Sequence, residues 1–186
     1  RNSQNLTANR IGFLMRSGYA LIWPVYKGTY ERGYPEFPNY VGNNSKIYAD
    51  QMIMMVKDYS RAIDFVEQDD DLLNDVYYYG ISWGGMLGPL FLANDKRIKK
   101  AVWQVAGLGA RETRPEGSPL TFLSRINKPV LMLNGIYDQY FPFETSQKPM
   151  YELLSLKEPM KKMITYKSAH SPPSNQTSKE VLKWFK

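Results

Sequence analysis

Strand-like and helix-like patterns alternate along the whole chain, and this alternation restricts the fold more than any other feature of the sequence. Short apolar runs are followed by segments whose apolar residues lie three or four positions apart. Such an order predicts βαβ units, and therefore a parallel sheet with helices on both faces. The expected strands are 19–26, 76–82, 100–107, 129–135 and 162–168, and the expected helices are 6–16, 45–68, 84–94, 143–156 and 177–185.

Local signals support three of these elements. Residues 45–68 form the clearest helix, because their apolar side chains make one stripe at helical spacing. The run YALIWPVY over 19–26 is typical of a strand covered on both faces, and Pro24 marks its end. Thr177 and Glu180 resemble a capping box, which predicts the start of the closing helix.

Length and composition set the broad class. The 186 residues suit one domain over 1–186, and a hydrophobic share of 43% is enough for a packed core. No run of apolar residues is long enough to span a membrane. The net charge is +6, but the lysines are scattered, so we expect a solvated surface and no nucleic-acid partner. Cysteine is absent, which excludes disulfides and thiolate metal sites, and we expect a cytoplasmic protein.

A serine lies between two glycines at the point where an expected strand gives way to an expected helix. The pentapeptide Gly-Ile-Ser-Trp-Gly has the G-x-S-x-G spacing of a nucleophile elbow, with Gly80, Ser82 and Gly84 at the fixed positions. This turn strains the serine and exposes its hydroxyl, and the close backbones leave no room for flanking side chains. The N–H of Trp83 would then face a developing oxyanion at the helix N-terminus. The plainer alternative is a tight turn built from small residues.

A nucleophilic serine needs a base, and the base needs a carboxylate to orient it. His170 is the only histidine of the chain and follows the last expected strand, while Asp138 follows the strand before it. The carboxyl ends of parallel strands meet at one edge of a sheet, so both residues are expected beside Ser82. Glu144 is the second choice for the acid. The three acids 69–71 precede the serine strand at its other end and are expected to form a solvated turn rather than a cation site.

These residues stand in stretches that resemble α/β-hydrolases of the dienelactone hydrolase and prolyl-oligopeptidase catalytic-domain type. The stretches are SGYALIWPVYKGTYERG, YYYGISWGGMLGPL, KPVLMLNGIYDQYFPFETSQKPMYELL and SAHSPP. The nearer likeness is to bacterial esterase-like domains linked to serine/threonine kinases or to formylglycine-generating-enzyme-like modules. The resemblance implies an α/β-hydrolase fold and a serine hydrolase that uses Ser82, Asp138 and His170 without a cofactor or metal.

Hydrolases of this type complete the oxyanion hole with a second N–H, from the loop after the strand that precedes the first helix. The first expected helix begins close to Arg1. We therefore expect a domain that is incomplete at its N-terminus and lacks this donor. It is either a piece of a larger, multidomain protein or completed by another chain.

The expected substrate is a small carboxylic ester. The loop 108–128 is too short for a lid domain, which predicts an open site. Tyr26, Trp83 and Met86 are candidates for the acyl side of the pocket, although each could equally be core packing. Arg111 and Arg114 are candidate contacts for an acidic substrate, and the alternative is that both are simply solvated. Two alternatives stay open: a serine peptidase of the prolyl-oligopeptidase type, and a non-catalytic sensor or interaction module of the same fold.

Overall fold

The computed structural model describes residues 10–33, 44–73 and 75–186. They fall into two compact units. The first unit contains the described residues up to 73 together with 111–117, and the second contains 75–110 and 118–186. The expectation of a single domain over 1–186 stays a prediction.

The first unit is organised around α2, which spans Lys46–Val66. Ser45 caps this helix, because its Oγ accepts a hydrogen bond of 3.1 Å from the N–H of Tyr48. The helix buries four side chains along one face, Ala49, Met52, Met55 and Ile63, and this confirms the helix expected over 45–68. The other elements of the unit are the short helix α1 (Gly12–Met15) and the 3₁₀ turns η3 (Tyr30–Arg32) and η4 (Pro115–Gly117).

The prediction of a strand over 19–26 is wrong, because these residues form no ladder. The described strands form one sheet that ends at Val76–Ile81 on one side, and no strand joins it there from the described residues. Side-chain contacts with Asp58 of α2 hold this part of the chain instead. Arg32 donates to the carbonyl of Val25 at 2.6 Å and to both carboxylate oxygens of Asp58, and the Lys27 N–H donates to Asp58 at 2.7 Å. Of the helix expected over 6–16, residues 6–9 lie outside the described residues.

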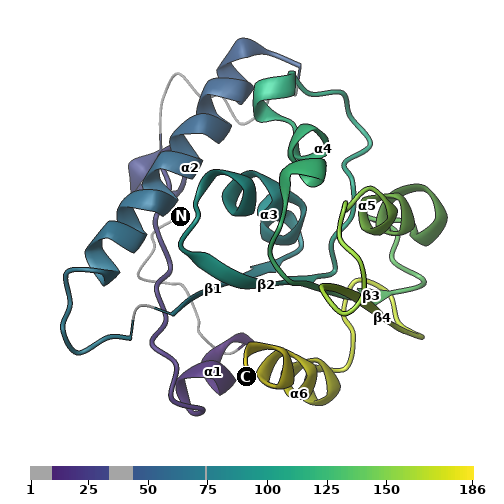
Figure 1. The fold of residues 1–186 in the computed structure, drawn as a ribbon. Helices are drawn as coiled ribbons and strands as arrows, with labels where there is room; N and C mark the ends of the chain where they lie inside the picture. The colour runs from purple at the N-terminus through teal and green to yellow at the C-terminus, as the bar shows by residue number, and fades with distance from the viewer. Residues whose placement is uncertain (1–9, 34–43, 74) are drawn as a thin grey trace. The chain divides into compact units, whose positions relative to one another are not determined.

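The second unit contains a parallel sheet of four strands (Figure 1). The strands lie in chain order, and each pairs in parallel with the next. Four of the five expected strands are thereby confirmed, with ends that shift by at most three residues. They are β1 (Val76–Ile81), β2 (Ile98–Gln104), β3 (Val130–Gly135) and β4 (Lys161–Tyr166).

Helices cover both faces of this sheet, with α3 (Trp83–Asn94) on one face and α6 (Ser174–Phe185) on the other (Figure 1). The middle of α3 is buried against β1 and β2. Gly88 allows this contact, because a Cβ at this position would come within 2.1 Å of the indole nitrogen of Trp103. The shorter helical elements are α4 (Pro119–Phe122), η5 (Leu123–Arg125), the π-helical turn η6 (Phe143–Gln147) and α5 (Lys148–Glu152).

Two helix predictions need correction. The helix expected over 143–156 begins with the π turn η6 and ends at Glu152. The capping box at Thr177 and Glu180 is wrong, since α6 already begins at Ser174, directly after Pro173. Thr177 lies inside the helix, where its hydroxyl donates to the Pro173 carbonyl one turn earlier, at 3.3 Å.

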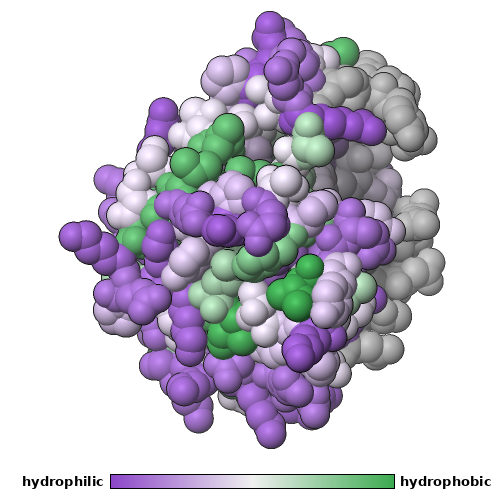
Figure 2. Space-filling view, turned by 90° about the vertical axis from the view of Figure 1, so that its right-hand side faces the viewer, coloured by the Kyte–Doolittle hydropathy of each residue, from purple (hydrophilic) through white to green (hydrophobic). Residues whose placement is uncertain are grey.

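On the face drawn in Figure 2, apolar groups are divided by polar ones, as is usual for a protein surface. Among the described residues, no helix combines the length and the apolar character that crossing a membrane requires.

Candidate active site

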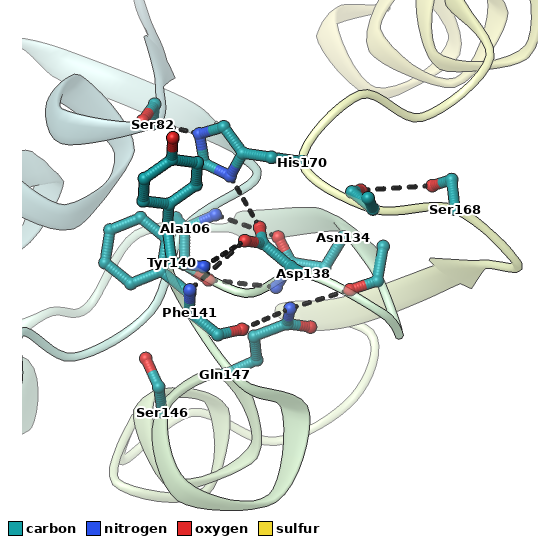
Figure 3. Close-up of polar contacts among 12 residues, drawn as sticks. Ser82, Ala106, Asn134, Asp138, Tyr140, Phe141, Ser146, Gln147, Ser168 and His170 are labelled. Atoms are coloured by element: carbon teal, nitrogen blue, oxygen red, sulfur yellow. Dashed lines mark hydrogen bonds and ion pairs between the residues drawn. The ribbon is translucent and has the colours of Figure 1, made fainter.

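The carboxyl ends of the four strands lie at one edge of the sheet, since all strands run in parallel. Ser82 follows β1 directly, Asp138 comes three residues after the end of β3, and His170 comes four residues after the end of β4. All three belong to the second unit. The sheet therefore brings together side chains that are far apart in the sequence (Figure 3).

Ser82 occupies a strained turn. Its φ of 55° and ψ of −114° lie outside the regions that residues with a Cβ readily adopt. The turn is fixed on one side by β2, because the Ser82 N–H donates to the Gln104 carbonyl at 2.8 Å. On the other side α3 begins at Trp83. The strained strand-to-helix turn predicted from the G-x-S-x-G spacing is present.

The glycines around Ser82 differ in how much space they leave. A Cβ on Gly80 would lie 2.5 Å from the Gly84 carbonyl oxygen, so this position cannot carry a side chain. A Cβ on Gly84 would meet nothing closer than the Tyr78 hydroxyl, at 3.8 Å. A Cβ on Gly85 would lie 2.7 Å from the Cβ of Ala106. The steric restriction predicted for Gly84 is therefore found one residue later, at Gly85.

Ser82, His170 and Asp138 form a continuous chain of short contacts (Figure 3). His170 Nε2 lies 2.7 Å from Ser82 Oγ, and His170 Nδ1 lies 2.6 Å from Asp138 Oδ2. The Asp138 side chain is fully buried, whereas the imidazole keeps 22% of its surface exposed. Glu144, the second choice for the acid, is exposed and pairs with Lys148 at 3.4 Å. The structure thus places Asp138, and not Glu144, beside the imidazole.

Two neighbouring residues hold both Asp138 and His170. The N–H groups of Tyr140 and Phe141 donate to Asp138 Oδ1 at 2.9 and 3.2 Å, which leaves Oδ2 for the imidazole. The rings of the same two residues contact the imidazole, with centroids 4.8 Å away for Tyr140 and 6.0 Å away for Phe141. Sequence reasoning missed both residues. Their signal is position alone, two and three residues after the candidate acid.

Two buried amides support the loops that carry these residues. Gln147 Nε2 donates to the carbonyls of Gly135 and Phe141, at 2.8 and 2.7 Å, and so joins the two ends of the Asp138 loop. Asn134 exchanges two hydrogen bonds with the backbone of Ala106, at 2.9 and 3.0 Å. Sequence reasoning missed both amides. A polar residue such as Asn134 at the end of the apolar run VLMLNG was the available signal.

The loop that carries His170 packs tightly against the end of β3. A Cβ on Gly135 would come within 2.1 Å of the Ala169 carbonyl oxygen and 2.4 Å of the Ser168 carbonyl oxygen. The N–H of Tyr137 donates to the Ser168 carbonyl at 3.0 Å. Glycine at 135 is therefore what lets the loop before His170 approach the strand.

The remaining sequence-predicted residues lie in both units. Trp83 is the first residue of α3, where a helix leaves its N–H groups without intrahelical acceptors, and the residue is 42% exposed. Met86 lies in the first turn of the same helix and is half-buried. Tyr26 and Arg111 belong to the first unit, and their roles at the site stay predictions. Burial and the nearby Asp58 charge raise the pKa of Tyr26, which keeps its phenol protonated.

The acids 69–71 form a turn in which the Asp71 N–H donates to the Asp69 carboxylate at 3.0 Å. Across the residues that the structure describes, no group of three or more His, Asp or Glu side chains is arranged to hold a metal ion.

Comparison with known proteins gives a structural match but no sequence match. No protein-family model matches the chain, and no curated protein does. Among solved structures, the chain is similar to acetyl xylan esterase 1 from Thermoanaerobacterium sp. JW/SL YS485, with a TM-score of 0.65 at 17% identity over 86% of this chain and 63% of that one.

Two further solved structures are similar to the chain. One is a cold-adapted esterase from an Arctic intertidal metagenomic library, with a TM-score of 0.59 at 20% identity over 77% of this chain and 66% of that one. The other is a protein of Klebsiella pneumoniae assigned to the dienelactone hydrolases, with a TM-score of 0.58 at 20% identity over 72% of this chain and 61% of that one.

The chain thus spans less than two thirds of the length of each of these three proteins. At this level of identity the likeness concerns the fold. The relation to kinase-linked or formylglycine-generating-enzyme-like domains stays a prediction. The parallel sheet with helices on both faces, together with these matches, shows that the chain has an α/β-hydrolase fold.

Proposed function

We propose that this protein is a serine hydrolase that cleaves a carboxylic ester through an acyl-enzyme. Ser82 is the nucleophile, His170 the general base and then the general acid, and Asp138 the residue that orients the imidazole. The observation that carries the proposal is the continuous contact from Ser82 Oγ through the imidazole to Asp138, at 2.7 and 2.6 Å. The esterase names of the similar structures support an ester as substrate.

The geometry suits a two-step reaction. Asp138 Oδ2 accepts a hydrogen bond from the N–H at His170 Nδ1, which leaves Nε2 unprotonated and able to take the proton of the Ser82 hydroxyl. Oγ then attacks the ester carbonyl carbon and forms a tetrahedral intermediate. The bond to the alcohol oxygen breaks, and Nε2 returns its proton to that oxygen. Water repeats the same sequence on the Ser82 ester and releases the carboxylic acid.

Trp83 is the proposed oxyanion donor. Its N–H follows the nucleophile and lies at the N-terminus of α3, where the helix dipole favours negative charge. The strain at Ser82 supports this role, because it turns the chain so that a serine hydroxyl and the next N–H lie at the start of the same helix.

We propose Met86 as a residue of the acyl pocket, on less direct evidence than that for the triad. Met86 lies in the first turn of α3, and its N–H donates to the Ser82 carbonyl at 2.9 Å. This places it one helical turn from the nucleophile, as a residue beside the acyl chain would be. Tyr26 as a further acyl contact and Arg111 as a contact for an acidic substrate remain proposals from the sequence.

The direct test is covalent labelling of Ser82. A fluorophosphonate probe should add once to the 186-residue chain, and peptide mass spectrometry should locate it on Ser82. The variant Ser82→Ala should lose both labelling and hydrolysis of p-nitrophenyl acetate. Ser178→Ala is the matched control, because Ser178 lies half-buried on α6, where its hydroxyl donates to the Ser174 carbonyl, so labelling should not change.

Two outcomes would reject the assignment. Labelling that persists in Ser82→Ala would show that another residue is the nucleophile. A folded wild-type protein that neither reacts with the probe nor hydrolyses the ester would favour the non-catalytic module.

A further inference from the structure

We propose that Tyr140 selects the alcohol portion of the substrate, and that it favours esters whose alcohol group carries an aromatic ring. This inference rests on the proposed serine-hydrolase function. It adds a residue that determines specificity and a class of leaving group.

Tyr140 is anchored beside the reacting atoms but open to solvent. Its ring contacts the imidazole of His170 in an edge-on arrangement, with a centroid distance of 4.8 Å and an interplanar angle of 63° (Figure 3). Its N–H donates to Asp138 Oδ1 at 2.9 Å, which fixes the main chain at this position. Even so, 69% of the residue surface is exposed. A ring beside the imidazole, with its main chain held and most of its surface uncovered, is suited to contact a bound molecule.

The reaction places the alcohol portion on the same side. The alcohol oxygen receives its proton from His170 Nε2, so it must come within hydrogen-bond distance of that atom. Nε2 belongs to the ring that Tyr140 contacts, and it lies 2.7 Å from Ser82 Oγ. Substituents on the alcohol oxygen therefore extend from a point next to the Tyr140 ring. The acyl group stays bonded to the carbon that Ser82 attacks.

Exposed aromatic surface at this edge favours an aromatic partner. Aromatic pairs prefer centroid distances of about 4.5–7 Å, which a ring one or two bonds from the alcohol oxygen can reach. Trp83, next to Ser82, is also 42% exposed and adds apolar surface at the same strand ends. Phe141 contacts the imidazole as well but is only 8% exposed, so it serves packing rather than substrate contact.

The test compares two acetate esters of similar size, benzyl acetate and cyclohexylmethyl acetate. Both form the same acetyl-enzyme, and kcat/KM reports the steps up to release of the alcohol. The ratio of the two kcat/KM values therefore cancels any change in His170 that affects both esters alike. Wild-type protein should prefer the benzyl ester, Tyr140→Phe should keep the preference, and Tyr140→Leu should reduce it by about 2- to 12-fold.

Tyr137→Leu is the matched control, because Tyr137 lies in the same loop and is similarly exposed, at 65%. Its ratio should equal that of the wild type. An unchanged ratio in Tyr140→Leu, or an equal loss in Tyr137→Leu, would overturn the role of Tyr140 while Ser82 labelling still supports the hydrolase. Failure of both esters in a protein that the fluorophosphonate does not label would instead reject the proposed function, and this inference with it.

Discussion

Asp138 reaches His170 with one carboxylate oxygen while its other oxygen is already held by the main chain. Oδ2 lies 2.6 Å from His170 Nδ1, and Oδ1 accepts the N–H groups of Tyr140 and Phe141. The carboxylate cannot rotate without losing those two hydrogen bonds. Its orientation toward the imidazole is therefore set by the loop, before any substrate arrives.

This arrangement predicts the effect of Asp138→Asn. The amide oxygen should stay with the two N–H donors, which leaves the NH₂ group facing His170 Nδ1. The imidazole must then accept at Nδ1 and carry its proton on Nε2, so it cannot take the proton of Ser82. We expect kcat to fall by about 10⁴-fold with an unchanged melting temperature. Steady-state kinetics on p-nitrophenyl acetate and a thermal melt measure both, and a loss below tenfold would contradict the role of Asp138.

The glycines near Ser82 give a second prediction, on stability. In Gly85→Ala the new Cβ would come within 2.7 Å of the Ala106 Cβ, so α3 must move away from the sheet. We expect the free energy of unfolding to fall by about 1–3 kcal/mol, the usual cost of overpacking. Reactivity of Ser82 toward a fluorophosphonate should also fall, since α3 begins directly after the serine.

Gly84→Ala is the control for this prediction. Its Cβ would meet nothing closer than 3.8 Å, so a urea titration should give nearly the wild-type stability. If Gly84→Ala proved the more damaging of the two, the packing described for Gly85 would not be what limits this turn.

Much of the second unit could be predicted from the sequence. The run VLMLNG that became β3 is buried along its whole length, and strands covered by helices on both faces leave such a continuous apolar pattern. The run over 19–26 has the same pattern and forms no strand. An apolar run in the sequence indicates that its side chains can be buried. A strand also needs a neighbouring strand to pair with, and the run itself does not specify that neighbour.

The same limit applies to the candidate site. Ser82, Asp138 and His170 could be proposed because each follows a strand and parallel strands end at one edge. Tyr140 and Gln147 could not, since their contacts depend on how the loops pack against one another after folding. The steric role of Gly85 could not be predicted for the same reason, because it depends on a contact with Ala106, which follows β2.

Asn134 leads to a third prediction. Its amide exchanges two hydrogen bonds with Ala106, and it is fully buried. Asn134→Leu keeps the branched shape but leaves the Ala106 N–H and carbonyl without partners, at about 1–3 kcal/mol each. We expect the free energy of unfolding to fall by roughly 2–6 kcal/mol. Asn94→Leu is the control, because Asn94 is exposed and makes one hydrogen bond, to the Leu90 carbonyl. Equal losses in the two variants would contradict the bridging role of Asn134.

Gln147 gives the last prediction, because it controls the loop that carries Asp138 without touching the reacting atoms. Its NH₂ group binds the carbonyls of Gly135 and Phe141, while its Oε1 is buried and has no hydrogen-bond partner in the described part of the chain. Gln147→Leu removes both donors but also removes the unpaired oxygen, so the two effects on stability oppose each other. We expect a modest change in stability, near 1 kcal/mol, with a much larger fall in kcat, up to about 10²-fold, as Asp138 shifts.

Gln147→Glu should be less stable than Gln147→Leu, because it buries a carboxylate beside two carbonyls. Urea titration and saturation kinetics on p-nitrophenyl acetate separate the two quantities. A kcat in Gln147→Leu that equals the wild-type value would show that the loop holds Asp138 in place without this amide.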